Sequence, residues 1–309
     1  MSRPPLVSIG LPTYNRAASL KRAIESVLIQ DYQNIELLIS DNASTDETQA
    51  ICLAACQRDD RVKYVRQPKN HGVSTNFQEV LDRARGEFFM WLADDDWLGQ
   101  ETYVAACVKI LSASPAHALV CGRARYYDDE QLVLEERGIS LLDDSGPKRV
   151  LAYYAQVSGN GVFYGLMRRE HLLHILQRKI FGGDWLMIAE IAFVGKVETL
   201  DKVSLNRSIK GMSRDLEKLA LDLGTSWLMA QSPHLKVAAS AWADVVWKTP
   251  LYRALSLPAR LILGSRSFIT ICKHCIIPYW YGQAYAYVNR EHPRFRRVAK
   301  TLKDRLTTS

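Results

Sequence analysis

The chain has 309 residues, of which 48% are hydrophobic and 24% are charged. These fractions are ordinary for a globular protein, and they exclude a disordered, collagen-like or coiled-coil chain. The length favours two domains, or one large domain with an appendage, and it allows a full hydrophobic core without disulfides or structural metals.

The positive charge of the chain is concentrated towards its C-terminal end. The formal net charge is +7, from 40 Lys and Arg against 33 Asp and Glu. Residues 251–309 contain 11 Lys and Arg but only 2 Asp and Glu, so residues 1–250 are close to neutral. Such a basic tail indicates an anionic partner, which can be a membrane surface, a nucleic acid or a phosphorylated substrate.

Cysteine usage and hydropathy favour a reducing, cytosolic setting. The six cysteines are sparse and show no disulfide framework, and the first residues contain no apolar signal-peptide segment. The most apolar stretch, residues 261–280, is interrupted by Arg266 and Lys273. We therefore expect no transmembrane span.

Short apolar runs alternate with helical patterns in the first hundred residues. We expect strands at 6–11, 35–40, 62–65 and 87–92, with a helix between each pair. Asn15 is expected to cap the first helix, and Ser44 with Glu47 to form a capping box for the second. This order predicts an α/β fold with a doubly wound, mainly parallel sheet.

The rest of the chain predicts a less regular pattern that ends in helices. Short strands are expected at 117–121 and 196–200, and exposed loops at 128–136 and 142–148. The pattern is helical from 210 to 247. We divide the chain into a domain over 1–208 and a helical C-terminal region over 209–309.

Three polar clusters follow predicted strands, at residues 12–16, 40–46 and 93–97. Ligands bind outside the carboxyl ends of the strands in open α/β sheets, so these clusters predict a ligand site. Asp94, Asp95 and Asp96 repel one another without a counter-cation, which suits a Mg²⁺ ion shared with a substrate phosphate. A solvated acidic turn is the alternative, and spacing alone does not decide between the two.

Three stretches of the sequence carry a family resemblance. They are VSIGLPTYNRAASLKRAIESVLIQDYQNIELLISDNASTDET, KNHGVSTNFQEVLDRARGEFFMWLADDDWL and FGGDWLMIAEIAFVG, in this order. The first 110 residues resemble the nucleotide-diphospho-sugar domain of family 2 glycosyltransferases. The resemblance implies the GT-A fold, here with a C-terminal helical extension.

The resemblance also implies residues that bind the donor and a metal. Those expected to contact the donor are Pro12, Thr13, Tyr14, Arg16, Asp41, Asn42, Gly72, Asn76 and Asp94. Asp41 matches an aspartate that binds the base, and an acceptor-only carboxylate suits the imide N–H of uracil or thymine, so UDP- and dTDP-sugars are favoured. We expect Asp95 to ligate Mg²⁺ or Mn²⁺, with Asp96 as a second ligand if the motif is read as D-x-D.

Two further segments match the family pattern. Asp184 is at the position of the catalytic base, although by residue type alone it reads as a helix N-cap, and the two roles are compatible. Lys210, Ser213 and Arg214 lie in a segment that resembles the one covering the donor diphosphate. A turn before a helix, with Ser213 as its cap, is the alternative.

The implied function is that of an inverting glycosyltransferase in bacterial surface polysaccharide synthesis. The acceptor is expected to be a hydroxyl of a glycan or of a polyprenyl-linked sugar. A sugar-phosphate nucleotidylyltransferase and an inactive glycosyltransferase-like binding protein are the alternatives. The aromatic, basic tail after residue 249 suits peripheral attachment to the inner face of the cell membrane, or packing on the body, and we expect no nucleic-acid partner.

Overall fold

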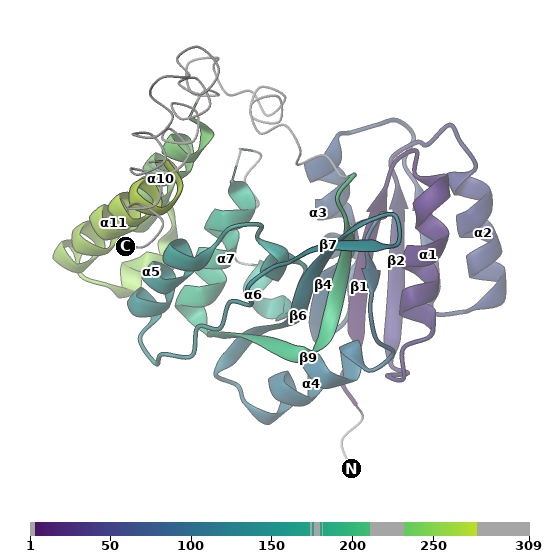
Figure 1. Cartoon of the computed structure of the whole chain (residues 1–309), viewed down its shortest axis with the longest axis horizontal. Helices are drawn as coiled ribbons and strands as arrows, with labels where there is room; N and C mark the ends of the chain where they lie inside the picture. The colour runs from purple at the N-terminus through teal and green to yellow at the C-terminus, as the bar shows by residue number, and fades with distance from the viewer. Residues whose placement is uncertain (1–3, 174, 176–179, 181, 211–231, 277–309) are drawn as a thin grey trace, which may run out of the picture. The chain divides into compact units, whose positions relative to one another are not determined.

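The computed structural model describes residues 4–173, 175, 180, 182–210 and 232–276. These residues divide into two compact units. The larger unit holds 4–173, 175 and 183–210, and the smaller unit holds 180, 182 and 232–276. Figure 1 shows the sheet of the larger unit in purple to green and helices α10 and α11 of the smaller unit in green to yellow.

Parallel strands form the first half of the sheet, in the order β3-β2-β1-β4. The strands are β1 (Val7–Thr13), β2 (Ile35–Asp41), β3 (Val62–Arg66) and β4 (Phe88–Trp91). Parallel neighbours need crossover connections, which helices provide. The helices are α1 (Ala17–Leu28), α2 (Thr48–Arg58) and α3 (Val73–Arg83). The predicted alternation of strands and helices is confirmed.

The second half of the sheet mixes parallel and antiparallel pairs. Its order is β4-β8-β6-β9-β5, with β7 paired to β6. The long strands β6 and β9 run parallel, whereas β8 is antiparallel to both β4 and β6. The strands are β5 (Trp97–Leu98), β6 (His117–Asp128), β7 (Gln131–Glu135), β8 (Leu166–Arg168) and β9 (Lys196–Ser208). The expected α/β fold with a mainly parallel sheet is confirmed.

Helices connect and cover the second half of this sheet. They are α4 (Tyr103–Ala113), α5 (Gly146–Gln156), the 3-10 helix η1 (Gly161–Tyr164), α6 (Arg169–Leu173) and α7 (Gly183–Val194). Residues 185–192 of α7 are all buried. A helix that is apolar on every side belongs inside a protein, and α7 packs against α5.

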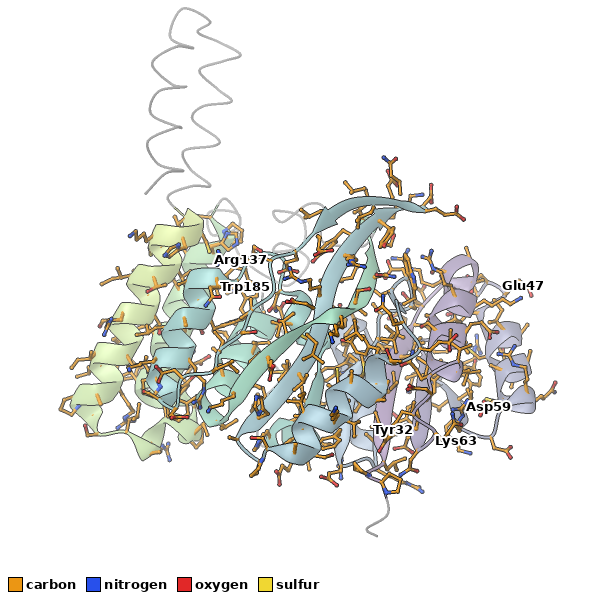
Figure 2. All side chains as sticks on the ribbon, turned by 60° about the horizontal axis from the view of Figure 1, so that its bottom comes forward. Tyr32, Glu47, Asp59, Lys63, Arg137 and Trp185 are labelled. Atoms are coloured by element: carbon orange, nitrogen blue, oxygen red, sulfur yellow. The ribbon has the colours of Figure 1, made fainter. Side chains whose placement is uncertain are left out.

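The core of the larger unit lies on the central strands. Val7, Ile9 and Leu11 of β1 are fully buried, as are all four residues of β4. Trp91 of β4 stacks on Phe163 of η1, with ring centroids 5.1 Å apart and planes 7° apart. Side chains of the helices and strands fill the interior of the unit (Figure 2). This packing fixes the ends of β1 and β4, where the site residues lie.

Three local predictions were wrong. Arg16 precedes α1 as its N-cap, while Asn15 has a positive φ of 52°. The capping box does not form, because the Ser44 hydroxyl accepts a 2.9 Å hydrogen bond from the Asn15 amide, and Glu47 is the N-cap of α2 without a side-chain bond. Residues 131–135, expected in a loop, form strand β7 through pairing with β6. The second expected loop is shorter than predicted, since α5 begins at Gly146.

The smaller unit is helical in its described part. It contains α10 (Pro233–Ala243), the π-helix η3 (Asp244–Lys248), the 3-10 helix η4 (Pro250–Ala254), α11 (Leu257–Ile271) and the π-helix η5 (Cys272–Ile276). Within the described ranges, every helix is too short or too polar to cross a bilayer. Most of the predicted aromatic, basic tail, from residue 277 on, lies outside the described residues.

Candidate active site

The predicted polar clusters meet at the carboxyl edge of the sheet. Thr13 at the end of β1 pairs in register with Asp41 at the end of β2. On the other side of β1, the Leu92 amide, just after β4, donates to the Gly10 carbonyl at 2.9 Å. The residues that follow β1, β2 and β4 are therefore neighbours, as expected for parallel strands.

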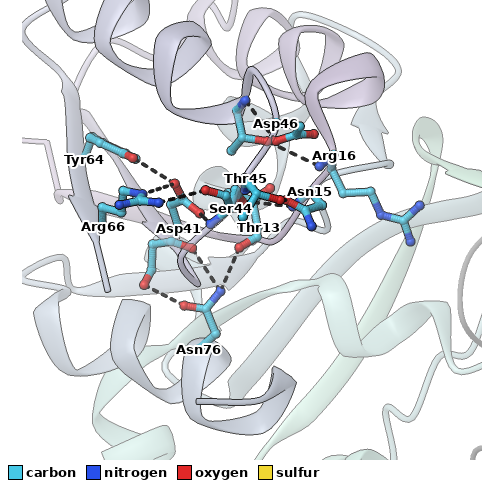
Figure 3. Close-up of polar contacts among 12 residues, drawn as sticks. Thr13, Asn15, Arg16, Asp41, Ser44, Thr45, Asp46, Tyr64, Arg66 and Asn76 are labelled. Atoms are coloured by element: carbon cyan, nitrogen blue, oxygen red, sulfur yellow. Dashed lines mark hydrogen bonds and ion pairs between the residues drawn. The ribbon is translucent and has the colours of Figure 1, made fainter. Parts of the chain in front are cut away.

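Asp41 is a buried anchor beneath this edge. Its carboxylate accepts hydrogen bonds from the Ser44 amide and from the Tyr64 hydroxyl, each at 2.8 Å, and Arg66 lies 3.7 Å away (Figure 3). Burial, followed by the Asp41 carboxylate, raises the pKa of Tyr64 well above its usual value. The side chain of Asp41 is fully buried. A nucleotide base that contacts Asp41 must therefore displace some of the protein groups around its carboxylate.

Asn42 and Asn76 are also buried and are engaged within the protein. Asn42 donates to Asn70 at 2.8 Å and accepts from the His71 amide at 2.9 Å, which shapes the loop leading to Gly72. Asn76 donates to the carbonyls of Thr13 and Ser40, and it accepts from the Ser40 hydroxyl. The amide of Asn76 thus ties β1 and β2 to α3, and it supports the edge from below.

The loop after β1 offers the exposed groups of the edge. Pro12 and Thr13 are buried, whereas Tyr14 is 43% exposed. The Tyr14 amide donates to Asp94 at 3.3 Å, and the Arg16 guanidinium lies 3.7 Å from the same carboxylate. The sequence pattern had placed Tyr14, Arg16 and Asp94 in one site, and the structure brings these three together.

Asp94 is an acid in a low-solvent position. Its side chain is 14% exposed. Burial raises the pKa of Asp94 to about 7, and the neighbouring Asp95 adds to the rise, while Arg16 and the Tyr14 amide oppose it. A nearby cation would stabilise the ionised form of this buried carboxyl group and lower its pKa.

Asp96 differs from Asp94, because its cationic partner is closer and less exposed than Arg16. Its buried carboxylate lies 3.0 Å from the Arg207 guanidinium and accepts from the Ser208 amide at 3.2 Å. Burial raises the pKa of Asp96 to about 6, against the attraction of Arg207. Burial alone would lower the pKa of Arg207, but the Asp96 carboxylate raises it overall. Both oxygens of Asp96 are thus engaged within the protein, and its role as a metal ligand stays a prediction.

The three aspartates after β4, Asp94–Asp96, form an acidic tip whose side chains suit a divalent cation. No cluster of three or more acidic, His or Cys ligands occurs in the described part of the chain. Asp95 is partly exposed, and Asp94 beside it lacks full charge compensation. Mg²⁺ usually takes only one or two protein carboxylates and completes its shell with water and substrate phosphate. The pair therefore fits a cation that is shared with a diphosphate.

Asp184 lies in the first turn of α7, away from the acidic tip in sequence but linked to it in space. Asn160 donates to its carboxylate at 2.7 Å. Burial raises the pKa of Asp184, while Asn160, the backbone amides of the first turn and Arg207 oppose the rise. Burial also raises the pKa of Tyr164, and the charges of Asp95, Asp96 and Asp184 all add to that rise. Tyr164 is thus close enough to both acidic groups to be affected by their charges, and the charge of Arg207 acts on both Asp96 and Asp184.

The remaining predicted residues lie elsewhere. Lys210 forms an ion pair with Asp129 in the turn between β6 and β7 and lies 3.8 Å from Asp128. Ser213 and Arg214 are outside the described residues.

Two residues of the site were not among those expected from the sequence. Arg207 lies three residues before Lys210, but its ion pair with Asp96 joins residues 111 positions apart, which no local pattern reveals. Asn160 lies in a Gly-Asn-Gly turn, and that pattern signals only a tight turn. The site as a whole combines the aspartates after β4, a cation paired with one of them and a separate buried carboxylate, which is suited to acid–base chemistry on a phosphorylated ligand.

Comparison with known proteins identifies the relatives of this chain. A family model described as glycosyl transferase family 2 matches residues 8–176. The chain is 30% identical over 182 residues to GalNAc(5)-diNAcBac-PP-undecaprenol beta-1,3-glucosyltransferase of Campylobacter jejuni, a match that covers 59% of this chain and 56% of the relative. Matches to the first curated relatives cover 56%, 39% and 58% of their lengths, so the chain spans about half of them.

Solved structures share the fold at low identity. S. aureus TarS 1-349 aligns with a TM-score of 0.60 and 14% identity, over 94% of this chain and 82% of that one. The mannosyltransferase PcManGT of Pyrobaculum calidifontis aligns with a TM-score of 0.55 and 17% identity, over 99% of this chain and 86% of that one. The architecture is the GT-A fold, and the family match covers more than half of the sequence. The chain belongs to glycosyl transferase family 2.

Proposed function

We propose that this chain transfers a sugar from a nucleoside diphosphate donor to an acceptor hydroxyl, with inversion at the anomeric carbon. The observation that carries the proposal is the pairing of two distinct acidic groups. One is the group of aspartates after β4, Asp94–Asp96, and the other is Asp184 at the start of α7. Arg207 pairs with Asp96 at 3.0 Å, and its charge also acts on Asp184. Family membership supports this assignment over a sugar-phosphate nucleotidylyltransferase.

In this proposal Asp184 is the general base. A hydroxyl is a poor nucleophile until its proton is removed, and a positioned base contributes about 10² to 10⁴ in rate. Burial raises the pKa of Asp184, which makes its carboxylate a stronger proton acceptor than an exposed one. Attack from the face opposite the leaving group inverts the anomeric centre through an oxocarbenium-like state, without a covalent intermediate.

The tip and the loop after β1 hold the donor diphosphate. Asp95, with Asp94 beside it, would hold Mg²⁺ or Mn²⁺, which as a Lewis acid stabilises charge on the departing diphosphate. The structure of PcManGT in complex with GDP-Man and Mn2+ supports the proposal that a metal is bound in this fold. Arg16 contributes a cation at the same place, 3.7 Å from Asp94. Arg207 forms an ion pair with Asp96 at 3.0 Å and thereby fixes the position of the Asp96 carboxylate.

The donor base is proposed to be a pyrimidine. Asp41 can accept only, and a carboxylate has about four acceptor sites, so it can bind an imide N–H once part of the protein around it has been displaced. A related structure, TarS 1-349, is in complex with UDP-GlcNAc. Since PcManGT is in complex with GDP-Man, the fold itself does not select the base.

The acceptor is proposed to be a glycan or a polyprenyl-linked sugar in surface polysaccharide synthesis. The name of the Campylobacter jejuni relative specifies an undecaprenol-linked glycan. We place this enzyme in the cytoplasm, attached peripherally to the inner face of the membrane.

The surface of the smaller unit supports this placement. Residues 245–276 contain five Lys and Arg and no Asp or Glu. Five large apolar side chains among the same residues are 41–63% exposed, namely Trp247, Leu257, Leu261, Ile262 and Ile269. A segment that combines cations with exposed Trp, Leu and Ile suits an anionic lipid surface, where each cation contributes about 1 kcal/mol.

A donor panel tests the transfer reaction. UDP-, dTDP- and GDP-sugars are added with Mn²⁺ or Mg²⁺, and thermal stabilisation and nucleotide release are measured. We expect one nucleotide class to stabilise the protein and only with metal. Asp184→Asn should keep this stabilisation and lose transfer, and Asp95→Asn should lose the metal-dependent stabilisation. Asp201→Asn, at a carboxylate 74% exposed on β9, is the matched control. Wild-type turnover in Asp184→Asn would disprove the base assignment.

Vesicle binding tests the membrane placement. Full-length protein is sedimented with vesicles of phosphatidylcholine alone or mixed with phosphatidylglycerol. We expect binding only to the anionic vesicles, and a loss in the double variant Ile262→Ser and Ile269→Ser. Val133→Ser, at a residue 57% exposed on β7, is the control for a loss of apolar surface elsewhere. Equal binding of all three proteins would contradict the proposed surface.

A further inference from the structure

A tight turn before η1 presents one amide to Asp184. Asn160 is 3% exposed and has left-handed backbone angles, with φ 53° and ψ 34°. Its Nδ2 donates to the Asp184 carboxylate at 2.7 Å, and its Oδ1 accepts from the Tyr153 hydroxyl at 2.7 Å. A carboxylate can only accept, so the NH₂ end of the amide must face Asp184. The orientation of Asn160 is therefore fixed by its two partners.

The turn itself is held by Glu136, a buried residue just after β7. The Glu136 carboxylate accepts from the amides of Gly159 and Gly161, each at 3.1 Å, and from the Tyr126 hydroxyl at 3.1 Å. A Cβ at Gly161 would be 2.4 Å from the Cβ of Ala124. A Cβ at Gly159 would be 2.6 Å from the Tyr126 hydroxyl. Glycine is thus required at position 161, whereas at position 159 a Cβ would displace the ends of the Tyr126 and Glu136 side chains that hold the turn.

The same contacts reach the acidic tip. Tyr126 accepts a 3.1 Å hydrogen bond from Arg207, and Arg207 pairs with Asp96. Glu136 therefore joins the turn that carries Asn160 to the residues that shape the end of β4. Two parts of the site that are far apart in sequence share one polar network.

We infer that Asn160 is a positioning residue, which aims the Asp184 carboxylate at the acceptor hydroxyl and stabilises its ionised form, and that Glu136 holds Asn160 in place. This inference rests on the proposed function of Asp184 as base. A base must be held within hydrogen-bond reach of the proton it removes, and partners behind a reacting group provide this orientation. The bond from Asn160 is charge-assisted, which makes it stronger than a bond between neutral groups.

The surroundings of Asp184 define what removal of the amide does. Burial raises the pKa of Asp184, and Asn160, the first-turn amides of α7 and Arg207 of β9 hold it down. On the neighbouring elements, the Tyr164 hydroxyl of η1 is affected by the Asp184 charge, the Tyr153 hydroxyl of α5 donates to Asn160, and Glu136 binds the turn and the Tyr126 hydroxyl of β6. Glu190 lies about 1.7 turns further along α7 and is buried. Arg149 of α5 binds the carbonyls of Ala192 and Phe193 at the opposite end of the helix.

Two substitutions test the inference in the full-length enzyme. Asn160→Gly removes the amide but permits the left-handed backbone, and Asn160→Asp keeps the shape but places a second carboxyl group against Asp184. We expect kcat at neutral pH to fall about 10- to 100-fold in Asn160→Gly, as for other orienting partners, with an unchanged KM for the donor. The acidic limb of the kcat–pH profile should move to higher pH in both variants, and further in Asn160→Asp.

The background of Asp184→Asn separates orientation from folding. If Asn160 acts through Asp184, adding Asn160→Gly to Asp184→Asn should produce little further loss. An equal loss in both backgrounds, or a fall in kcat with an unmoved acidic limb, would reduce Asn160 to a structural role and overturn the inference. Wild-type kcat in Asn160→Gly, with transfer abolished in Asp184→Asn, would overturn the inference alone. Transfer that survives in Asp184→Asn would remove the proposed base and the inference together.

Discussion

Replacing Arg207 by Gln isolates the buried ion pair at the end of β4. The Asp96 side chain is 2% exposed and that of Arg207 16% exposed, so water cannot replace the lost charge. Arg207 also donates to Tyr126 at 3.1 Å and lies 4.6 Å from the ring centroid of Tyr164. Removing one partner of such a pair costs about 3–5 kcal/mol, because the other charge stays buried and unpaired. At about 2–4 °C per kcal/mol for a domain of this size, the thermal midpoint should fall by about 6–20 °C.

Calorimetry without donor or metal measures this change. The control is Arg83→Gln, which removes the same charge from the Arg83–Glu79 pair, whose side chains are 50% and 30% exposed. Exposed pairs contribute about 0–1 kcal/mol, so this midpoint should fall by only a few degrees. The double variant Asp96→Asn and Arg207→Gln leaves no unpaired charge and should recover part of the loss. Equal midpoints in the two single Arg variants would refute the argument that burial makes the Asp96 pair strong.

Three further predictions concern stability. Gly10→Ala places a Cβ 2.6 Å from Cγ2 of Val80 on α3, and this overpacking should lower the free energy of unfolding by about 1–3 kcal/mol, as measured by calorimetry. An unchanged thermal midpoint would show that α3 can move to accommodate the methyl group. Burial raises the pKa of Asp184, so its contribution to stability is present below about pH 4 and is lost as pH rises through the folded pKa. The thermal midpoint of Asp184→Asn relative to wild type should therefore rise from pH 4 to pH 8. Burial raises the pKa of Asp46, but hydrogen bonds from Thr48 and Ala17 outweigh burial and lower it overall, so the stabilisation from this carboxylate is present above about pH 4 and is lost as pH falls. The midpoint of Asp46→Asn relative to wild type should therefore fall as pH rises to just above 4 and stay level beyond it; parallel pH curves for the Asp184 and Asp46 variants would contradict both signs.

The strands of the fold were predictable because they carry the strongest local signal. Apolar runs such as residues 6–11 and 87–92 fit only buried strands, and the helices between them require a parallel order. β7 escaped prediction because acidic residues surround it and all of its residues are exposed. Its strand character comes from pairing with β6, which is a tertiary effect.

The site residues that lie at strand ends could be predicted from the sequence, whereas the contacts that tertiary packing adds to them could not. Strand ends and polar clusters indicated Asp41 and the three aspartates, because the fold class alone places them at one edge. The sequence cannot show which aspartate is neutralised, since that depends on Arg207 arriving from β9. The failed capping box has the same origin. Ser44 can bond locally or to the Asn15 amide, and the tertiary contact prevails.

The bonds from Asn76 to the carbonyls of Thr13 and Ser40 have a consequence for protein engineering. The loops after β1 and β2 are natural candidates for exchange between glycosyltransferases, because they follow the carboxyl ends of the strands. Here a transplanted loop after β1 or β2 must still accept the hydrogen bonds of Asn76, so its conformation is constrained by the α3 helix of the host protein. Chimeras should therefore exchange both loops together with the first turn of α3, as one interlocked module.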